Sequence, residues 1–406
     1  MTAALDEAPA LPGGGRAGAG EAGWAGAVEE VAAVVAEHGR RNDELASFPV
    51  EALSALRASG LMGLLVPAAY GGLGGGVREM SEVTQRLGRA DMSVAMIFTM
   101  HCQQVAALAR YAGQDLRDEL LPEIAAGRIY LASVTTEAGK GGHLLSSGSP
   151  LESDEAGRTL MVDRFAPIVT GGLHADGFLI TMRSPYSDSP SDVSLVYAPR
   201  ELLEITPSGD WQPLGMRASH SVGLRLTGQV PGHYVVGEHG RFRDVASGVF
   251  APLAHIGWSA AWLGTACGAL SRVVALLRSP AERGRYDLSS ELLLTRLATA
   301  RRRLDTVHAL LLRTVDMTAT AEDLTTPACQ LLLNALKVTA SEECHAAVQD
   351  LVDLLGLRHG YLRDSPTGLE RALRDLRSAA LNYSNDRLRL AAGRLALLDS
   401  EVRLVR

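Results

Sequence analysis

The side chains of this sequence that are best suited to proton chemistry lie near the C-terminus and on one apolar stretch. Residues 374–386 read RDLRSAALNYSND and contain Tyr383 and Asp386. Tyrosine is a poor base at neutral pH, because its phenol ordinarily ionises near pH ~10. Asp386 follows one helical turn later, ~4.5 Å along the axis, if a helix continues through both residues. His255 could be a neutral base near pH 7. These three side chains are the candidate catalytic groups.

Each candidate also has a structural interpretation. Asp386 lies between Asn385 and Arg387, which is typical of a solvated or salt-bridged residue. A histidine on a largely apolar helix more often forms a hydrogen bond within the packing. The series Arg371, Arg374 and Arg377 shares a helical face by threes and favours a structural ion-pair stripe with Asp375 nearby.

A second segment could bind an anion. Residues 135–143 read TTEAGKGGH. Thr135 and Thr136 offer hydroxyl donors, and Gly141 and Gly142 let backbone N–H groups approach a diphosphate closely. The alternative is an ordinary glycine turn between a helix and a strand.

Composition excludes several other classes of function. The net charge of −7 argues against a nucleic-acid partner. The cluster at 301–303 (RRR) therefore indicates a solvated or interface face, with an anion site as the alternative. The four cysteines lie far apart, which favours a reducing cytoplasm and no metal site. No run approaches the ~20 apolar residues of a membrane span, and GxSxG and HExxH motifs are absent.

The elements that must position these side chains fall into three regions. Residues 1–23 are rich in Ala and Gly and indicate a disordered leader. Helical periodicity follows over 24–128, and short strand-like runs over 129–241 indicate a small antiparallel β domain. Residues 242–406 return to helical periodicity, with segments at 243–278, 289–320, 326–355 and 367–399 that predict a four-helix bundle. The fold class is therefore α+β, mostly α.

This order of regions and several motifs resemble the acyl-CoA dehydrogenase superfamily. The stretch 48–75, from Phe48-Pro49 to Gly74-Gly75, is similar to that family's first helix and loop. Residues 215–219 (GMRAS) resemble the end of its β domain. The resemblance covers nearly all of the chain beyond the leader, and it implies an FAD-dependent oxidoreductase acting on an acyl thioester of coenzyme A or an acyl carrier protein.

The resemblance also assigns site residues, with departures at most of them. The family's catalytic glutamate falls on Tyr383, and the alternative glutamate position of some members falls on Ala254. The family's flavin loop falls on residues 135–143. On the strand behind the flavin, many family members have a tryptophan and a threonine, and these two positions fall on Pro167 and Val169. Further cofactor contacts fall on Arg283, Arg285 and Asn385.

Three functions remain open. The first is an acyl thioester dehydrogenase with an electron-transfer partner. The second is a flavin-dependent monooxygenase on the same fold, which uses oxygen and needs no base for an α-proton. The third is a non-catalytic subunit that pairs with an active paralogue. The resemblance further implies a homodimer or homotetramer in the cytoplasm, with neither a membrane nor a nucleic-acid partner.

Overall fold

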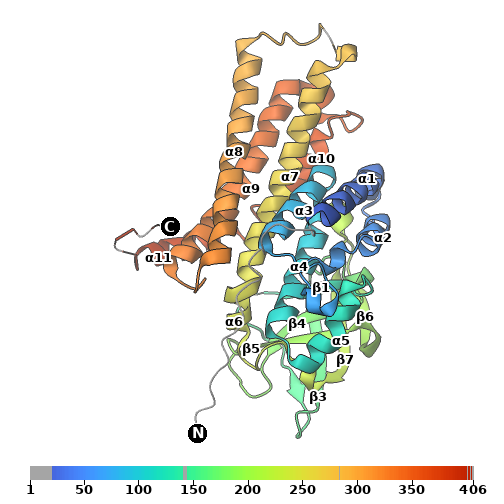
Figure 1. Cartoon of the computed structure of the whole chain (residues 1–406), viewed down its shortest axis with the longest axis vertical. Coiled ribbons are helices and arrows are strands. Elements are labelled where there is room, and N and C mark those ends of the chain that lie inside the picture. The colour runs from blue at the N-terminus through green and yellow to red at the C-terminus, as the bar shows by residue number, and fades with distance from the viewer. Residues whose placement is uncertain (1–20, 140–143, 283, 400, 403, 405–406) are drawn as a thin grey trace.

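The computed structural model of the chain describes residues 21–139, 144–282, 284–399, 401, 402 and 404. Helices occupy both ends of the chain and strands its middle, which confirms the predicted fold class. The leader predicted for residues 1–23 lies almost wholly outside the described residues. Figure 1 shows the N-terminal helices and the sheets packed around the lower half of a long helical bundle.

The N-terminal region consists of five helices, which pack side by side above the sheets. Their bounds are α1 (Glu21–Leu45), α2 (Val50–Ala58), α3 (Val77–Ala90), α4 (Met92–Tyr111) and α5 (Gln114–Ala125). Asp91 separates α3 from α4, because its carboxylate accepts a hydrogen bond from the backbone N–H of Val94 (3.1 Å) and caps α4.

The middle region contains two sheets. The first has the order β1-β4-β5 and the second the order β2-β3-β7-β6. Among the seven described strands, the pairings are antiparallel except that between β1 and β4, which is parallel and was not anticipated. The strands are β1 (Leu131–Val134), β2 (Glu152–Ser153), β3 (Thr159–Ala166), β4 (Gly177–Arg183), β5 (Val193–Pro199), β6 (Leu203–Ser208) and β7 (Gly223–Pro231).

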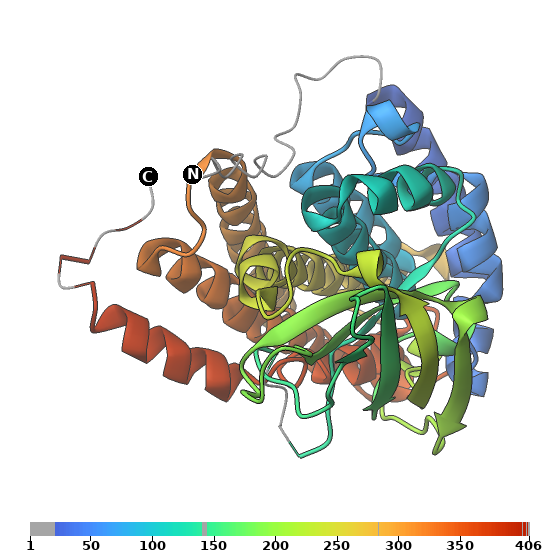
Figure 2. The same cartoon turned by 90° about the horizontal axis from the view of Figure 1, so that it is seen from below.

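The C-terminal region is built on three long helices and a broken fourth segment. A short helix α6 (Phe242–Val245) and one π-helical turn lead into α7 (Ala251–Arg278), which is followed by α8 (Glu291–Thr320) and α9 (Pro327–Gly356). The predicted fourth helix over 367–399 is instead two helices, α10 (Leu369–Arg377) and α11 (Asn385–Ala396), separated by a turn at 378–384. Helix α11 projects from the body of the molecule in both views (Figures 1 and 2).

Among the residues that the structure describes, two helices are long and apolar enough to cross a membrane by length and composition alone, namely Met92–Tyr111 and Phe242–Arg278. In the most apolar windows of these helices, 89% and 61% of the residues are buried inside the protein. Helix α7 packs against α3, α4, α8 and α9. Both helices therefore form the core that joins the three regions.

Candidate functional site

The Tyr383 side chain is presented by the turn that interrupts the fourth bundle segment. Its backbone has φ of +50°, in the left-handed region that bulky residues rarely adopt. The side chain is partly exposed, and its ring centroid lies 6.4 Å from that of His255 on α7. The structure thus brings together two of the three candidate catalytic residues, from segments far apart in sequence.

The third candidate lies apart from this pair. Because the chain turns at 378–384, Asp386 does not continue a helix from Tyr383, and the hypothesis that it follows one helical turn later is wrong. Its side chain is 91% exposed and forms an ion pair with Arg389 (3.2 Å). Asp386 is therefore a solvated, salt-bridged residue, which was the alternative to a catalytic role.

His255 is buried beside two aromatic rings. The ring centroids of Trp258 and Tyr383 lie 6.3 Å and 6.4 Å from that of His255. Burial, reinforced by the charge of Lys337, lowers the pKa of His255 to about 4. Its Nδ1 has no hydrogen-bond partner within the described residues. His255 is therefore neutral at pH 7 and retains one ring nitrogen for a hydrogen bond to a ligand.

A buried lysine supports this site and was missed by the sequence analysis. The ammonium of Lys337, on α9, donates to the carbonyl oxygens of Ala379 (3.1 Å) and Tyr383 (2.9 Å) and to Oδ1 of Asn385 (2.7 Å). One signal was available, because Lys337 is one of only two lysines in the sequence.

Asn385 is part of the same internal network. Its amide nitrogen donates to Ser341 Oγ and to Glu342 Oε1, both at 3.0 Å, while its oxygen accepts from Lys337. The side chain is buried, with 4% exposure. Both ends of the amide are thus occupied within the chain, which leaves Asn385 a structural residue rather than the predicted cofactor contact.

The predicted flavin loop begins at the end of β1. Thr135 and Thr136 are half-buried there, and the Thr136 hydroxyl donates to the carbonyl oxygen of Ile168 (2.8 Å). Arg164, with 1% side-chain exposure, donates to the carbonyl oxygen of Thr136 (2.8 Å) and lies 3.7 Å from the Glu137 carboxylate. This buried arginine therefore fixes the start of the loop, while Gly141 and Gly142 lie outside the described residues.

The backing segment meets this loop directly. Pro167 is half-buried beside Ile168, whose side chain is 47% exposed. Val169 is fully buried, and its side chain covers Gly172, so it belongs to the core rather than to a ligand-facing surface. The exposed Ile168 and the half-buried Thr135 offer an apolar face and a hydroxyl, which suit the ring of a flavin.

Arg285 lies at the other end of the molecule. It is in the connection after α7, at the end of the bundle opposite the sheets (Figure 1). Ala254 and Arg278 on the continuous helix α7 are already roughly 36 Å apart at 1.5 Å per residue. Thr135 and Arg285 of one chain therefore cannot contact the same flavin; Arg283 lies outside the described residues.

The charge of Arg285 is partly neutralised. Its Nε lies 3.4 Å from the carboxylate of Glu282, which is nearly buried and also lies 3.6 Å from Arg358 and 3.4 Å from His359. The Glu282 carboxylate thus lies between Arg285 and the segment that contains Arg358 and His359.

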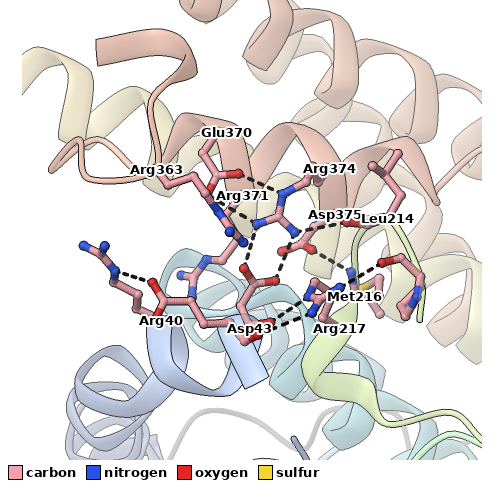
Figure 3. Close-up of polar contacts among 12 residues, drawn as sticks. Arg40, Asp43, Leu214, Met216, Arg217, Arg363, Glu370, Arg371, Arg374 and Asp375 are labelled. Atoms are coloured by element: carbon pink, nitrogen blue, oxygen red, sulfur yellow. Dashed lines mark hydrogen bonds and ion pairs between the residues drawn. The ribbon is translucent and has the colours of Figure 1, made fainter. Parts of the chain in front are cut away.

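A network of charges lies where the three regions meet (Figure 3). Arg374 forms an ion pair with Asp43 of α1 (2.6 Å) and another with Glu370 (2.8 Å), while Arg371 pairs with Asp91 (3.4 Å). The predicted ion-pair stripe is confirmed for these two arginines; Arg377 is exposed.

Asp375 ties the same helix to the sheet domain. Its carboxylate accepts a hydrogen bond from the backbone N–H of Met216 (2.6 Å), and burial raises its pKa to about 7. The neighbouring Gly215 is required for this contact, because a Cβ there would lie 2.1 Å from the carbonyl oxygen of Arg374. These contacts fix the position of α10, immediately before the turn that carries Tyr383.

The remaining sequence candidates have structural roles. In the cluster at 301–303, Arg301 pairs with Asp305 and Arg303 pairs with Glu343 and Asp350. Within the described parts of the chain, no group of three or more His, Cys, Asp and Glu side chains is placed to hold a metal ion.

Comparisons with known proteins agree with this architecture. Residues 21–128 match the family "Acyl-CoA dehydrogenase, N-terminal domain", and residues 256–386 match "Acyl-CoA dehydrogenase, C-terminal domain". A probable acyl-CoA dehydrogenase of Mycobacterium leprae is 23% identical over 368 residues, which cover 90% of this chain and 91% of that protein.

Two further similarities are to monooxygenases. The dibenzothiophene monooxygenase of Rhodococcus qingshengii is 27% identical over 237 residues, 56% of this chain and 55% of that protein, so the match spans about half of its length. The FMN-bound structure of TdsC from Paenibacillus sp. A11-2 aligns with a TM-score of 0.81 at 21% identity and covers 93% of this chain and 97% of that one. Together with the order of helical, sheet and helical regions, the two family matches show that this chain belongs to the acyl-CoA dehydrogenase superfamily.

Proposed function

We propose that this chain is a flavin-dependent monooxygenase. The proposal rests on the residues that stand where family members hold their catalytic base. Tyr383 and Ala254 occupy the two glutamate positions, and Asp386 points into solvent beside Arg389. Glu342, the other carboxylate of this network, is engaged by Asn385 and Arg389. None of these four positions therefore offers a free carboxylate that could remove an α-proton from a substrate.

The groups that are present suit the binding of a polar substrate. The neutral His255 can accept a hydrogen bond at Nδ1, and the Tyr383 hydroxyl can donate one. The ring of Trp258 lies beside that of His255, which is itself buried. These residues orient a substrate without taking a carbon-bound proton from it.

A flavin is the cofactor that the family membership implies, and Thr135, Thr136 and Ile168 would hold its ring. When bound, it would supply the electrons that reduce oxygen. FAD is the specific form that the sequence predicted, with its diphosphate meeting Arg285 of a second copy of the chain. Because Glu282 competes for Arg285, we propose that the dinucleotide end is weakly held, and mass spectrometry of extracted flavin distinguishes FAD from FMN.

The second candidate is dehydrogenation of an acyl thioester, on coenzyme A or an acyl carrier protein, with electrons passed to an electron-transfer partner. It is favoured by the match to the probable acyl-CoA dehydrogenase of Mycobacterium leprae, which covers 91% of that protein. A non-catalytic subunit is the outcome if the purified chain neither contains nor takes up a flavin.

The test supplies the flavin-loaded protein with a flavin reductase, NADH and ¹⁸O₂, and screens aromatic heterocycles and acyl thioesters as substrates. We expect a product that carries one ¹⁸O atom. A product that gains a carbon–carbon double bond and no ¹⁸O would overturn the proposal in favour of the dehydrogenase.

A further inference from the structure

We propose that Lys337 is the positioning residue of this site: its ammonium group fixes the turn between α10 and α11 and thereby the place of the Tyr383 ring beside His255. The consequence for catalysis rests on the function proposed above. The structural part of the proposal does not.

The geometry of the contacts is the first support. Lys337 is fully buried, and an ammonium group carries three N–H donors. All three have an acceptor: Ala379 at the start of the turn, Tyr383 within it and Asn385 at the first position of α11. One nitrogen atom thus joins both ends of the turn to the rigid helix α9.

The conformation of the turn is the second support. Tyr383 has positive φ, a conformation that costs free energy and persists only where surrounding contacts impose it. The segment contains no glycine or proline between Ser378 and Ser384 that would terminate a helix. Lys337 binds the carbonyl oxygen of the strained residue itself, so its hydrogen bond stabilises the unusual conformation directly.

The choice of residue is the third support. The chain contains 37 arginines and two lysines, Lys140 and Lys337. A guanidinium is planar, whereas an ammonium directs three N–H groups tetrahedrally from one atom. Three oxygens that all accept from one nitrogen atom suit the second geometry, which is consistent with a lysine in a chain that otherwise uses arginine almost throughout.

The surroundings of Lys337 determine its response to pH. Burial lowers its pKa to about 8, Glu342 opposes this shift and Arg389 adds to it. The ring of Trp262 lies 5.6 Å from the ammonium, and the neutral His255 lies nearby. As the pH rises through about 8, Lys337 loses one proton and with it a donor and the charge, so the turn should loosen.

The experiment measures the turn without flavin or substrate. Hydrogen exchange followed by mass spectrometry reports on residues 378–388, where the amides of Leu381, Asn382 and Asn385 donate to backbone carbonyls within the turn. The segment Gln114–Ala125 provides the internal reference for the intrinsic effect of pH. In a Lys140→Arg background, NMR of ¹³Cε-lysine then shows a single signal, that of Lys337.

Two variants separate geometry from charge. Lys337→Met removes both, and Lys337→Arg retains the charge but not the tetrahedral donors. Arg272→Met is the matched control, because Arg272 on α7 is a half-buried cation that also donates to backbone carbonyls, those of Arg89 and Thr367.

We expect about tenfold faster exchange in residues 378–388 for both Lys337 variants and no local change for Arg272→Met. In the parent protein the corrected exchange of the turn should rise with the same midpoint, near pH 8, as the lysine NMR signal. Unchanged exchange in folded Lys337→Met overturns the proposal. If that variant does not fold, midpoints that differ by more than one pH unit in the parent protein overturn it.

Activity forms a separate arm. If the monooxygenase proposal holds, Lys337→Met should lower kcat more than it raises KM, because the substrate contacts remain while their alignment is lost. An inactive parent protein would count against the proposed function only, since the exchange and NMR measurements require no turnover.

Discussion

Arg374 and Asp375 lie at the junction of the three regions, and Tyr383 lies a few residues later in a turn beside His255. At the junction the charged side chains have partners, in pairs that join α1, α10 and the loop that contains Met216 (Figure 3). On α7, which contacts the turn through His255, Nδ1 of His255, Oγ of Ser259 and Nε1 of Trp262 are buried and lack partners within the described residues.

From this difference we infer that the junction mainly stabilises the fold, whereas the turn and the neighbouring part of α7 serve ligand binding. Buried polar atoms in proteins are nearly always hydrogen-bonded, so an unpaired group is a candidate for contact with a ligand. The satisfied network holds α10 in place, whereas His255, beside the turn that follows that helix, keeps an unpaired ring nitrogen. We therefore expect substitutions at the junction to unfold the protein and substitutions at the turn to change its activity.

The largest expected effect is that of Arg374→Ala at the junction. It leaves the carboxylates of Asp43 and Glu370 without their main cation, and Asp43 is buried. Removal of one partner of a buried ion pair costs about 3–5 kcal/mol of unfolding free energy. Urea denaturation measures it, with Arg389→Ala as the exposed control, for which we expect about 0–1 kcal/mol. Equal losses in both variants would contradict the account.

Asp375 should give the junction a distinctive pH dependence. Its pKa is about 7 in the folded protein and 3.8 as a free side chain, so the folded state holds the proton more tightly. The resulting contribution to the unfolding free energy is fully present below the pKa of Asp375 in the unfolded chain. It is lost as the pH rises from about 4 to 7, by at most about 1.4 kcal/mol per pH unit. Asp375→Asn should remove this component, which unfolding at a series of pH values reveals; identical pH profiles would refute it.

At the turn, His255→Leu should have the opposite balance of effects. Because Nδ1 is buried without a partner, its loss should leave the unfolding free energy unchanged or raise it by about 1 kcal/mol. Activity should fall by about 10²-fold if the imidazole orients the substrate. Paired measurements of melting temperature and turnover decide, and loss of stability without loss of activity would place His255 in the core instead.

The smallest effects should come from Tyr383→Phe and Asp386→Asn. The phenol fills the site of the family carboxylate, so we expect Tyr383→Phe to retain substantial activity, and Asp386→Asn to retain nearly all of it. Steady-state kinetics measures both. A loss of roughly 10³-fold in Tyr383→Phe, with the fold and flavin intact, would identify a working acid–base group.

The sequence predicted the fold far better than the site. Helical and strand periodicities were sufficient for the three regions, because the repeat of apolar residues marks the buried face of each element even where that face packs against another region. The break at 378–384 was not predicted, since residues such as Ala379, Ala380 and Leu381 favour a helix. Lys337 contacts Ala379 in that segment and Asn385 directly after it, which lie 42 and 48 positions further along the chain. A local sequence pattern does not reveal contacts between positions so far apart.

The cofactor residues illustrate the same limit. The roles of Thr135, Thr136 and Arg285 toward a flavin stay predictions, and the pairing of Arg285 with Glu282 was not predicted. The internal use of Asn385 and the burial of Val169 could not be read, because both depend on the packing of other elements.

The most direct test of the central claim, that the site lacks an α-proton base, is anaerobic mixing of butyryl-CoA with the flavin-loaded protein while the flavin absorbance is recorded. We predict no bleaching for the parent protein within minutes, and bleaching in Tyr383→Glu if the restored carboxylate reaches the substrate. Bleaching of the parent protein within seconds would contradict the account and identify an acyl-CoA dehydrogenase.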